Sequence, residues 1–480
     1  MNLGIVRYII SWVLKFEAAF LLLPSLTGFI YLEWKDALVY LGVALLCFLV
    51  GFTLGIKKPK HRELYTREGF ASVALSWTIM SLFGALPFVL TGDIPNYVDA
   101  LFETISGFTT TGASILNDVE ALSRANLFWR SFTHWIGGMG VFVFIMAILP
   151  LMGGSSFNLM KAESPGPSVD KLVPKIKDSA KILYSIYIGI TLLMIVILLL
   201  CGMPLFDTLT TTFGTVGTGG FGIMNDSLTG YSSTIQIVVT VFMILSGINY
   251  TVYFCLLLRN FKQAFIIEEV RWYLGIILAS VSIITINISS LYGNMATSLK
   301  HAFFQVGSII TTTGFATADF DSWPELSKNI LVLLMFIGAC SGSTGGGIKV
   351  SRIVILFKAI HKELHMMIHP RMVKKIRMDG RAIAHETLRS TNVFISVYLV
   401  ILLLSTLLIS VDNFGFTTNF TSVVATLNNI GPGLDMVGPT CNFSIFSPFS
   451  KCVLMFDMLA GRLELFPMLI LFLPACWKKH

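Results

Sequence analysis

The sequence predicts an all-α polytopic membrane protein, with four helix–loop–helix repeats around a pseudo-fourfold axis and two extra N-terminal transmembrane helices. Three observations support this fold class. The 480 residues are 54% hydrophobic and 13% charged, with a mean hydropathy of +0.77, which is typical of membrane proteins. Apolar runs of about 20 residues recur, and each can span the hydrocarbon core as a helix. Similar short segments ending in glycine lie between these runs.

The glycine-containing segment occurs in two clear copies and two looser ones. Residues 109–113 read TTTGA after ALFE at 100–103, and residues 311–315 read TTTGF after AFFQ at 302–305. The looser copies, each behind a comparable apolar approach, are GTGGF at 217–221 and NNIGP at 428–432. Because simple interhelical turns need not keep an aligned approach segment, we interpret the four copies, called glycine motifs below, as one structural repeat.

The apolar runs divide the chain into five parts. Two runs, about 5–31 and 37–56, precede the repeats, and the first of them keeps Lys15 and Glu17 without a small-residue cleavage site, as expected for a retained helix. Each repeat then contains an apolar run, a glycine motif and a second apolar run. The predicted parts are the N-terminal helix pair at 1–60 and repeats at 61–155, 156–262, 263–372 and 373–480.

The distribution of charge predicts the orientation in the membrane. Basic clusters lie before, between and after the repeats, for example at 57–62, at Lys161 and Lys171, and along 361–389, whereas the motif segments carry acidic residues. The positive-inside rule therefore predicts ten spanning helices, with the glycine motifs outside and both termini in the cytoplasm. The net charge of +7 is explained by these topology signals and does not indicate nucleic-acid binding.

A segment of about 10 residues between two spans can enter the bilayer and return, but only where protein or a water-filled cavity surrounds it. The approach segments 99–108, 205–213, 301–310 and 419–427 are predicted half-helices whose negative C-terminal ends point at the axis and stabilise a cation. The loops are therefore predicted pore loops, and the fold is four helix–pore-loop–helix repeats around a pseudo-fourfold pore.

Main-chain carbonyls of the glycine motifs are the predicted ion ligands, because carbonyl oxygens can replace the hydration shell of K⁺. Glycine suits the unusual torsions and leaves the pore open. Side-chain variation among the copies is then tolerable. The predicted ligand residues are Thr110, Thr111, Gly112, Thr218, Gly219, Gly220, Thr312, Thr313, Gly314, Asn429, Ile430 and Gly431.

A run of small residues, Ser341 to Gly347, interrupts the second apolar run of the third repeat. Glycine and serine disfavour helix, so we predict an unwound loop within the membrane that can block the pore. A tightly packed glycine-rich helix is the alternative. The predicted gate consists of Gly342, Ser343, Thr344, Gly345, Gly346, Gly347, Lys349 and Arg462.

Arg462 lies inside the last apolar run, where an arginine costs about 2.5–3.5 kcal/mol on insertion scales. It is expected to face water or a partner, either near the pore and the gating loop or in an ion pair with Glu464 or Asp457. Asn249 is a weaker polar candidate, for which an interhelical hydrogen bond is the simpler explanation.

Several other functions lack the necessary residues. Residues 217–222 read GTGGFG but follow a spanning run instead of a strand, which excludes the dinucleotide fingerprint. Residues 342–349 lack the GK[ST] ending of a P-loop. The seven cysteines have no metal-ligand spacing, although Cys441 and Cys452 share one external segment in which a bond is conceivable. No nucleophile, base or metal set lies in the spans, so we predict no enzyme and no covalent cofactor.

The chain resembles the Trk/Ktr/HKT superfamily of potassium transporters, and its N-terminal helix pair resembles that of the Trk-type membrane subunit. The resemblance covers nearly the whole chain and includes REGF at 67–70, WIGGMG at 135–140, GACSGSTGGG at 338–347 and TLNNIGPG at 426–433. It implies K⁺ uptake, with Rb⁺ accepted, in the inner membrane of a bacterium. Relatives that favour Na⁺ carry serine at the first motif glycine, whereas Gly112 occupies that position here. No copy reads TVGYG, so strict exclusion of Na⁺ does not follow.

The resemblance further implies a homodimer and a cytosolic nucleotide-binding ring subunit of the TrkA type. The basic face formed by His361, His365 and His369 is a candidate contact for anionic lipid or an acidic partner. Two transport mechanisms stay open beside a K⁺-selective channel: a proton- or sodium-coupled symporter and a less selective K⁺/Na⁺ transporter.

Overall fold

The computed structural model describes residues 1–59, 65–148, 176–371 and 375–478. In these ranges the regular secondary structure is helical apart from one short antiparallel hairpin, β1 (Arg377–Met378) and β2 (Arg381–Ala382), with Arg377 opposite Ala382. The predicted all-α membrane fold is confirmed. Lys161 and Lys171, and the predicted boundaries at 60/61, 155/156 and 372/373, lie outside the described residues.

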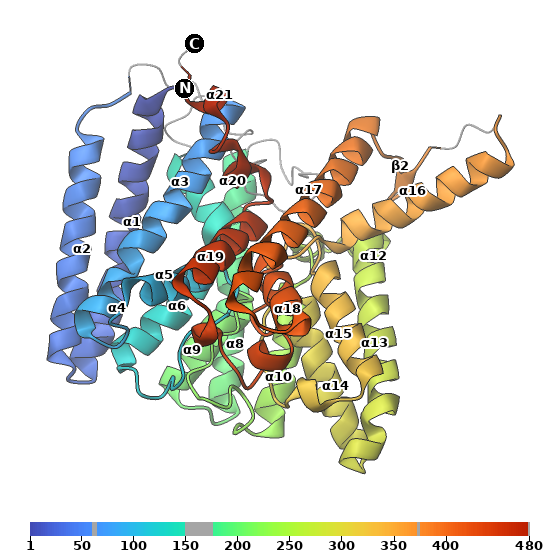
Figure 1. Cartoon of the computed structure of the whole chain (residues 1–480), viewed down its shortest axis with the longest axis horizontal. Coiled ribbons are helices and arrows are strands. Elements are labelled where there is room, and N and C mark those ends of the chain that lie inside the picture. Colours follow the sequence, from blue (N-terminus) through green and yellow to red (C-terminus); the bar gives the residue numbers. More distant parts are fainter. Residues whose placement is uncertain (60–64, 149–175, 372–374, 479–480) are drawn as a thin grey trace.

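The two N-terminal helices form a pair at one edge of the molecule (Figure 1). Helix α1 (Leu3–Ile30) packs along α2 (Trp34–Gly55). Small residues permit the close approach: a Cβ on Gly51 would lie 2.8 Å from the carbonyl oxygen of Ser11. Helix α1 also contacts α3 and α6 of the first repeat, so the pair covers that repeat from outside.

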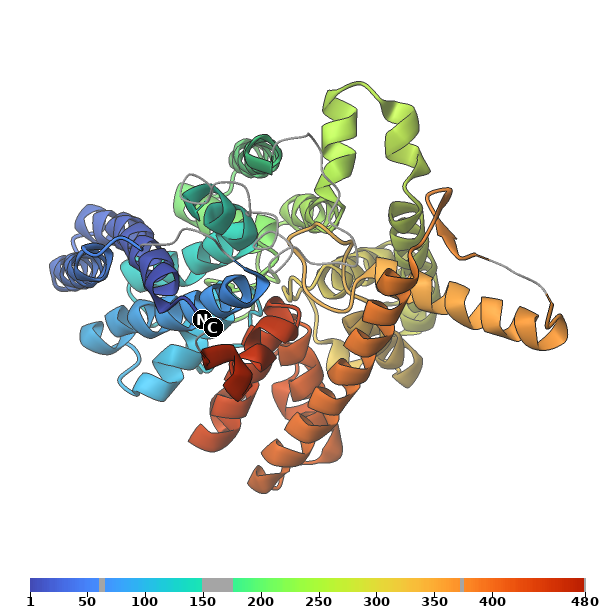
Figure 2. The same ribbon diagram turned by 90° about the horizontal axis from the view of Figure 1, so that it is seen from above.

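The four repeats follow one another in chain order around a common centre (Figure 2). Each contains a first helix, a short helix that leads into a glycine motif, and a second helix. The first repeat has α3 (Thr66–Gly84), α4 (Leu86–Thr91), α5 (Tyr97–Phe108) and α6 (Arg124–Ile148); the second has α8 (Ile176–Leu200), α9 (Leu205–Val216), α10 (Ser233–Ser246), α11 (Tyr250–Leu257) and α12 (Phe261–Ile266); the third has α13 (Glu268–Tyr292), α14 (Met295–Ile310), α15 (Glu325–Ile337) and α16 (Val350–Ile368); the fourth has α17 (His385–Ile409), α18 (Phe416–Leu427), α19 (Pro448–Arg462), α20 (Phe466–Ile470) and α21 (Pro474–Trp477).

The second helices of three repeats are broken. The break in the third repeat was predicted from its run of small residues, whereas the breaks in the second and fourth repeats were not. Six helices in the described part of the chain are long and apolar enough to cross a membrane, or seven if the pair α10 and α11, bent by 92°, is counted as one. The α10–α11 break is capped, since Asn249 Oδ1 accepts a hydrogen bond from Thr251 N at 2.9 Å. The side chain of Asn249 therefore caps the N-terminus of α11, and this hydrogen bond is within the helix and not between helices, as had been predicted.

The two ends of the chain meet on one face of the molecule (Figure 1). The amino group of Met1 donates a hydrogen bond to the carbonyl oxygen of Lys478 at 2.6 Å. Arg7 at the same end donates to the carbonyl oxygen of Lys57 at 2.8 Å. The chain thus begins and ends on the same side of its membrane-spanning body.

Helix α16 projects sideways from the body together with the β1–β2 hairpin (Figures 1 and 2). Lys358 holds the root of this projection, because its ammonium group pairs with Glu268 of α13 at 2.5 Å and donates to the carbonyl oxygen of Arg377 at 2.8 Å. Further along the helix the rings of His361 and His365 lie 4.4 Å apart. The N-terminus of α13 therefore contacts the projecting segment directly.

Candidate functional site

The short helices α5, α9, α14 and α18 are the half-helices predicted from sequence. Three of them contain 12 residues and α14 contains 16, so at 1.5 Å per residue none is long enough to span the membrane. All four end in the same hydrogen-bond pattern. In the first repeat Thr110 N donates to Gly107 O at 3.1 Å and Thr111 N donates to Ser106 O at 2.9 Å, which is a Schellman motif.

The residue at the left-handed position of each Schellman motif is a threonine or an asparagine. Its φ is +54° at Thr110, +56° at Thr218, +57° at Thr312 and +55° at Asn429. Glycine usually occupies this position, and a β-branched residue there is strained. The same strain at three threonines in equivalent places indicates a backbone shape that the surrounding structure imposes.

The four motif glycines form a closed ring. Their φ values lie between +80° and +98°, a region that favours glycine. A Cβ on Gly112 would lie 2.1 Å from the carbonyl oxygen of Gly219, one on Gly220 would lie 1.8 Å from that of Thr313, one on Gly314 would lie 2.0 Å from that of Ile430, and one on Gly431 would lie 2.8 Å from that of Thr111. Each glycine thus faces the carbonyl before the glycine of the next repeat, and the fourth repeat returns to the first.

The carbonyl oxygens of this ring take no part in the hydrogen bonds that stabilise the described part of the fold. In the described part of the chain, none of the carbonyl oxygens of the twelve predicted ligand residues accepts a hydrogen bond. Side chains make hydrogen bonds within and between motifs: Thr109 and Thr111 of the first motif share a hydrogen bond of 2.8 Å, and Asn429 Nδ2 of the fourth motif donates to Thr111 Oγ1 at 2.9 Å. Buried carbonyls without partners are costly unless a ligand replaces the missing donors.

The loop predicted within the third repeat is present. Helix α15 ends at Ile337 and α16 begins at Val350, and the residues between them, 338–349, form the intramembrane loop. Its backbone needs positive φ at Gly338, Gly342, Gly347 and Lys349. Most of the loop is buried, so the alternative of a continuous glycine-rich helix is wrong.

The intramembrane loop lies directly against the glycine motifs. Gly346 N donates to Thr312 Oγ1 at 2.6 Å. A Cβ on Gly345 would lie 2.9 Å from the carbonyl oxygen of Thr311, and one on Gly346 would lie 2.6 Å from that of Asn428. The small residues of the loop therefore fit under the ends of two half-helices, where larger side chains would collide.

Arg462, the last residue of α19, also contacts the intramembrane loop. Its guanidinium donates to the carbonyl oxygen of Thr344 at 2.8 Å and to that of Gly137 at 2.6 Å, and so joins the loop to α6 of the first repeat. Lys349, with 1% of its surface exposed, donates to the carbonyl oxygen of Gly345 within the loop. The predicted gate residues are thus brought together.

Of the two interpretations of Arg462, contact with the intramembrane loop is the one observed, and the alternative partner Asp457 has a different contact. Asp457 accepts a hydrogen bond from Ser405 Oγ at 2.7 Å. Glu464 pairs with Arg352 at the start of α16. The guanidinium carbon of Arg352 lies 3.8 Å from the ring centre of Phe394. Glu464, the other suggested partner of Arg462, therefore holds α16 against the break between α19 and α20.

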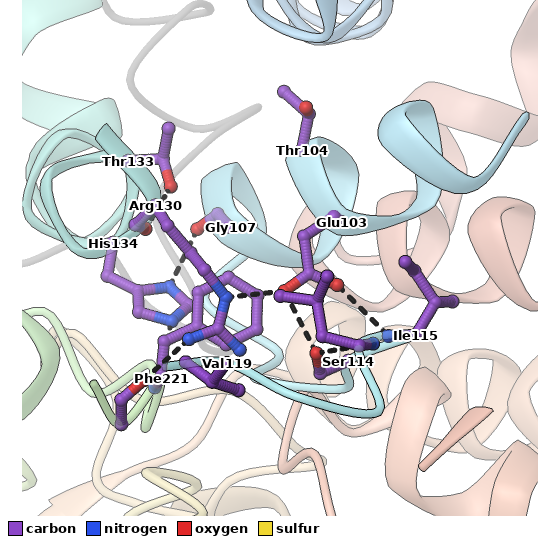
Figure 3. A network of polar contacts seen from close by, with 12 residues as sticks. Glu103, Thr104, Gly107, Ser114, Ile115, Val119, Arg130, Thr133, His134 and Phe221 are labelled. Carbon is purple, nitrogen blue, oxygen red and sulfur yellow. Dashed lines mark hydrogen bonds and ion pairs between the residues drawn. The ribbon is translucent and has the colours of Figure 1, made fainter. Parts of the chain in front are cut away.

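Two clusters of buried charge were missed by the sequence interpretation. Glu269 of α13 accepts hydrogen bonds from Ser341 N in the intramembrane loop at 2.7 Å and from Ser351 N in the first turn of α16 at 3.1 Å. Glu103 and Arg130 form an ion pair of 2.5 Å behind the first glycine motif (Figure 3). Both clusters could have been found by treating every ionisable residue within a spanning segment as a functional candidate.

The suggested disulfide is not formed. Cys441 and Cys452 are both free, and both are exposed. Among the described residues no group of three or more histidine, cysteine, aspartate or glutamate side chains could hold a metal ion.

Comparison with known proteins identifies the family. Residues 39–479 match the family TrkH, described as cation transport protein. The Trk system potassium uptake protein TrkH of Salmonella typhimurium is 39% identical over 468 residues, which are 96% of each chain, and TrkG of Escherichia coli is 33% identical over 95% of each chain. The crystal structure of the potassium transporter TrkH from Vibrio parahaemolyticus covers 100% of both chains with a TM-score of 0.89 and 32% identity. By sequence and by fold, the chain belongs to the TrkH family of cation transport proteins, and it is a transport protein and not an enzyme.

Proposed function

We propose that the chain takes up K⁺ across the inner membrane of a bacterium, through the ring formed by its four glycine motifs. The observation that carries the proposal is the set of carbonyl oxygens around the four glycines, none of which accepts a hydrogen bond within the described ranges. Such oxygens can replace the hydration shell of K⁺. The C-terminal ends of α5, α9, α14 and α18, which lead into the motifs, add partial negative charge.

Uptake of radioactive Rb⁺ into proteoliposomes tests this function, since Rb⁺ is an expected substitute for K⁺. We expect uptake that unlabelled K⁺ suppresses more strongly than Na⁺ does. Vesicles without protein are the control. Absence of Rb⁺ uptake by the purified chain, or stronger suppression by Na⁺ than by K⁺, would contradict the proposal.

Conduction through the ring is expected to be channel-like, and this prediction separates it from coupled symport. The ring is built from backbone carbonyls, which bind a bare cation without needing a coupling ion. Rb⁺ flux should therefore follow only the Rb⁺ gradient and the membrane potential. Measuring flux with and without imposed proton and sodium gradients, at clamped potential, decides the point: dependence on either gradient favours symport.

The intramembrane loop is the gate in this proposal. The closed arrangement is supported by the loop glycines under α14 and α18 and by the hydrogen bond from Arg462 to Thr344 O. Glu269 supports it further, because one carboxylate oxygen accepts from Ser341 N and from Ser351 N and so closes the neck of the loop.

Replacing Glu269 by alanine is expected to raise Rb⁺ flux in the absence of any partner. The change leaves two buried amide groups without an acceptor, and each such loss costs about 1–3 kcal/mol, which weakens the closed loop. Glu268→Gln is the matched control. Glu268 is the residue before Glu269, and its carboxylate contacts Lys358 on the projecting helix and not the loop. Flux through Glu269→Ala no higher than through the control would show that the neck does not hold the gate.

The partners proposed are a second copy of the chain and a cytosolic nucleotide-binding subunit of the TrkA type. Helix α16 extends from the body (Figure 2) and exposes Phe357, Leu364 and Met367 by 67%, 55% and 77%. An apolar stripe of this kind favours contact with another protein. Lys358 of α16 contacts Glu268 of α13, the residue before Glu269. A partner bound to α16 would therefore act close to the contact between Glu269 and the intramembrane loop. Cross-linking of a cysteine introduced at Met367 tests the homodimer.

A further inference from the structure

The first repeat contains a buried acid behind its glycine motif. Glu103 on α5 is 1% exposed, and its carboxylate accepts hydrogen bonds from Ser114 Oγ and Ile115 N, each at 3.0 Å (Figure 3). Ser114 and Ile115 follow Gly112 along the chain. Glu103 therefore fixes the stretch of backbone that leaves the first motif.

Arg130 connects Glu103 of the first repeat with the backbone of the second repeat. Its Nε donates to Glu103 at 2.5 Å, and its Nη1 donates to the carbonyl oxygen of Gly222 at 2.6 Å. The guanidinium also lies 3.6 Å from the ring centre of Phe221, within the range of a cation–π interaction. Phe221 and Gly222 directly follow Gly220, so one side chain contacts the backbone behind two neighbouring motifs.

His134, one turn further along α6, fills a gap in the second motif. Its Nε2 accepts a hydrogen bond from Phe221 N at 3.2 Å, and therefore its Nδ1 carries the proton that is donated to the carbonyl oxygen of Gly107 at 2.8 Å. A Cβ on Gly219 would lie 2.1 Å from Cγ of this ring. Glycine at 219, where the other motifs have Thr111, Thr313 and Ile430, is thus explained by the imidazole.

This arrangement occurs in one repeat. When the repeats are aligned on their motif glycines, the position of Glu103 is occupied by Thr211, Gln305 and Ser422. Gln305 makes a neutral version of the contact, donating to the carbonyl oxygen of Ala318 at 3.2 Å. At this position an ion pair therefore supports the first motif, whereas the aligned residues of the other repeats are uncharged.

We infer that Glu103, Arg130 and His134 form a clamp that sets the spacing between the first and second glycine motifs and so the discrimination between K⁺ and Na⁺. The clamp rests on the proposed function of the ring. These residues are positioning residues, because the hydrogen bonds described above join them to groups beside the motifs and not to a carbonyl oxygen of the twelve predicted ligand residues. Since each contacts backbone beside a motif, loosening the clamp changes the distance between carbonyl groups and lets the ring adjust to a smaller cation.

The test is the ratio of initial Rb⁺ and Na⁺ uptake rates in proteoliposomes containing Glu103→Gln. We expect this ratio to fall about tenfold, which corresponds to about 1.4 kcal/mol of differential binding. A ratio is independent of the amount of folded protein, so a loss of stability alone leaves it unchanged. Asp99→Asn is the matched control: it removes a carboxylate four residues earlier on α5, where the partner is Lys451 at 2.6 Å, and its ratio should stay at the wild-type value.

Arg130→Lys provides an independent reading. Lysine keeps the charge opposite Glu103 but lacks the planar fork needed to contact Glu103 and Gly222 together, so the ratio should again fall while the protein still folds. An unchanged ratio of Rb⁺ to Na⁺ uptake in Arg130→Lys would contradict the inference that the clamp sets selectivity. This result would count even if the Glu103→Gln protein did not reach the membrane. Failure of the wild-type chain to take up Rb⁺ would instead refute the proposed function, and the two failures are therefore distinguishable.

Discussion

Replacing Gly220 by alanine is expected to reduce Rb⁺ uptake at least about tenfold. The added Cβ would lie 1.8 Å from the carbonyl oxygen of Thr313, closer than any real contact, and the backbone there has a φ of +80°. Adopting left-handed torsions costs a residue other than glycine about 1–2 kcal/mol, before the collision is relieved. Either the ring opens or the carbonyl turns away, and both outcomes remove an ion ligand.

The four glycines should not respond equally, and this makes the prediction specific. Gly112 and Gly314 resemble Gly220, with contacts of 2.1 and 2.0 Å, whereas the Cβ of an alanine at Gly431 would lie 2.8 Å from the nearest carbonyl oxygen. Uptake by Gly431→Ala should therefore be the least reduced. Gly275→Ala is the control, since a Cβ on that glycine of α13 would meet no described atom within 4 Å. Equal uptake by Gly220→Ala and Gly275→Ala would contradict the ring.

The sequence was sufficient to predict the repeats because each leaves a local pattern. An apolar approach followed by glycine is visible at Gly112 and Gly314 without any knowledge of tertiary structure, and the four half-helices lie where that pattern put them. The run of small residues at 341–347 likewise predicted its own unwinding, because glycine and serine act through the local backbone.

Contacts between repeats could not be predicted in the same way. Arg130 and Gly222 are 92 residues apart, and neither carries a local signal that names the other. The pairing of Glu464 with Arg352 depends on how α16 enters the fold. The bend after Ser246 lies within a continuous apolar run. It could not be predicted, because the hydrophobic pattern that marks a membrane segment does not indicate whether the helix is straight.

Deleting Gly345 to Gly347 is expected to raise the basal Rb⁺ flux about tenfold in the absence of partners. The deletion removes the hydrogen bond from Gly346 N to Thr312 Oγ1 and the contact of Lys349 with the carbonyl oxygen of Gly345. Two bonds of about 0.5–1.5 kcal/mol each correspond to a shift of roughly 5- to 150-fold toward the open state. The neck at Glu269 remains in place, so the protein should keep its fold.

Arg462→Gln should act in the same direction, because it weakens the contacts with Thr344 O and Gly137 O that hold the intramembrane loop against α6. Lys328→Gln is the matched control: Lys328 belongs to α15, the helix that leads into the loop, and pairs with Glu325 of the same helix at 2.7 Å, away from the loop. Flux is measured as partner-free Rb⁺ uptake at fixed potential. If the deletion and Arg462→Gln both stay as closed as Lys328→Gln, the loop does not block the pathway, and the ring of carbonyls must be closed by another part of the chain.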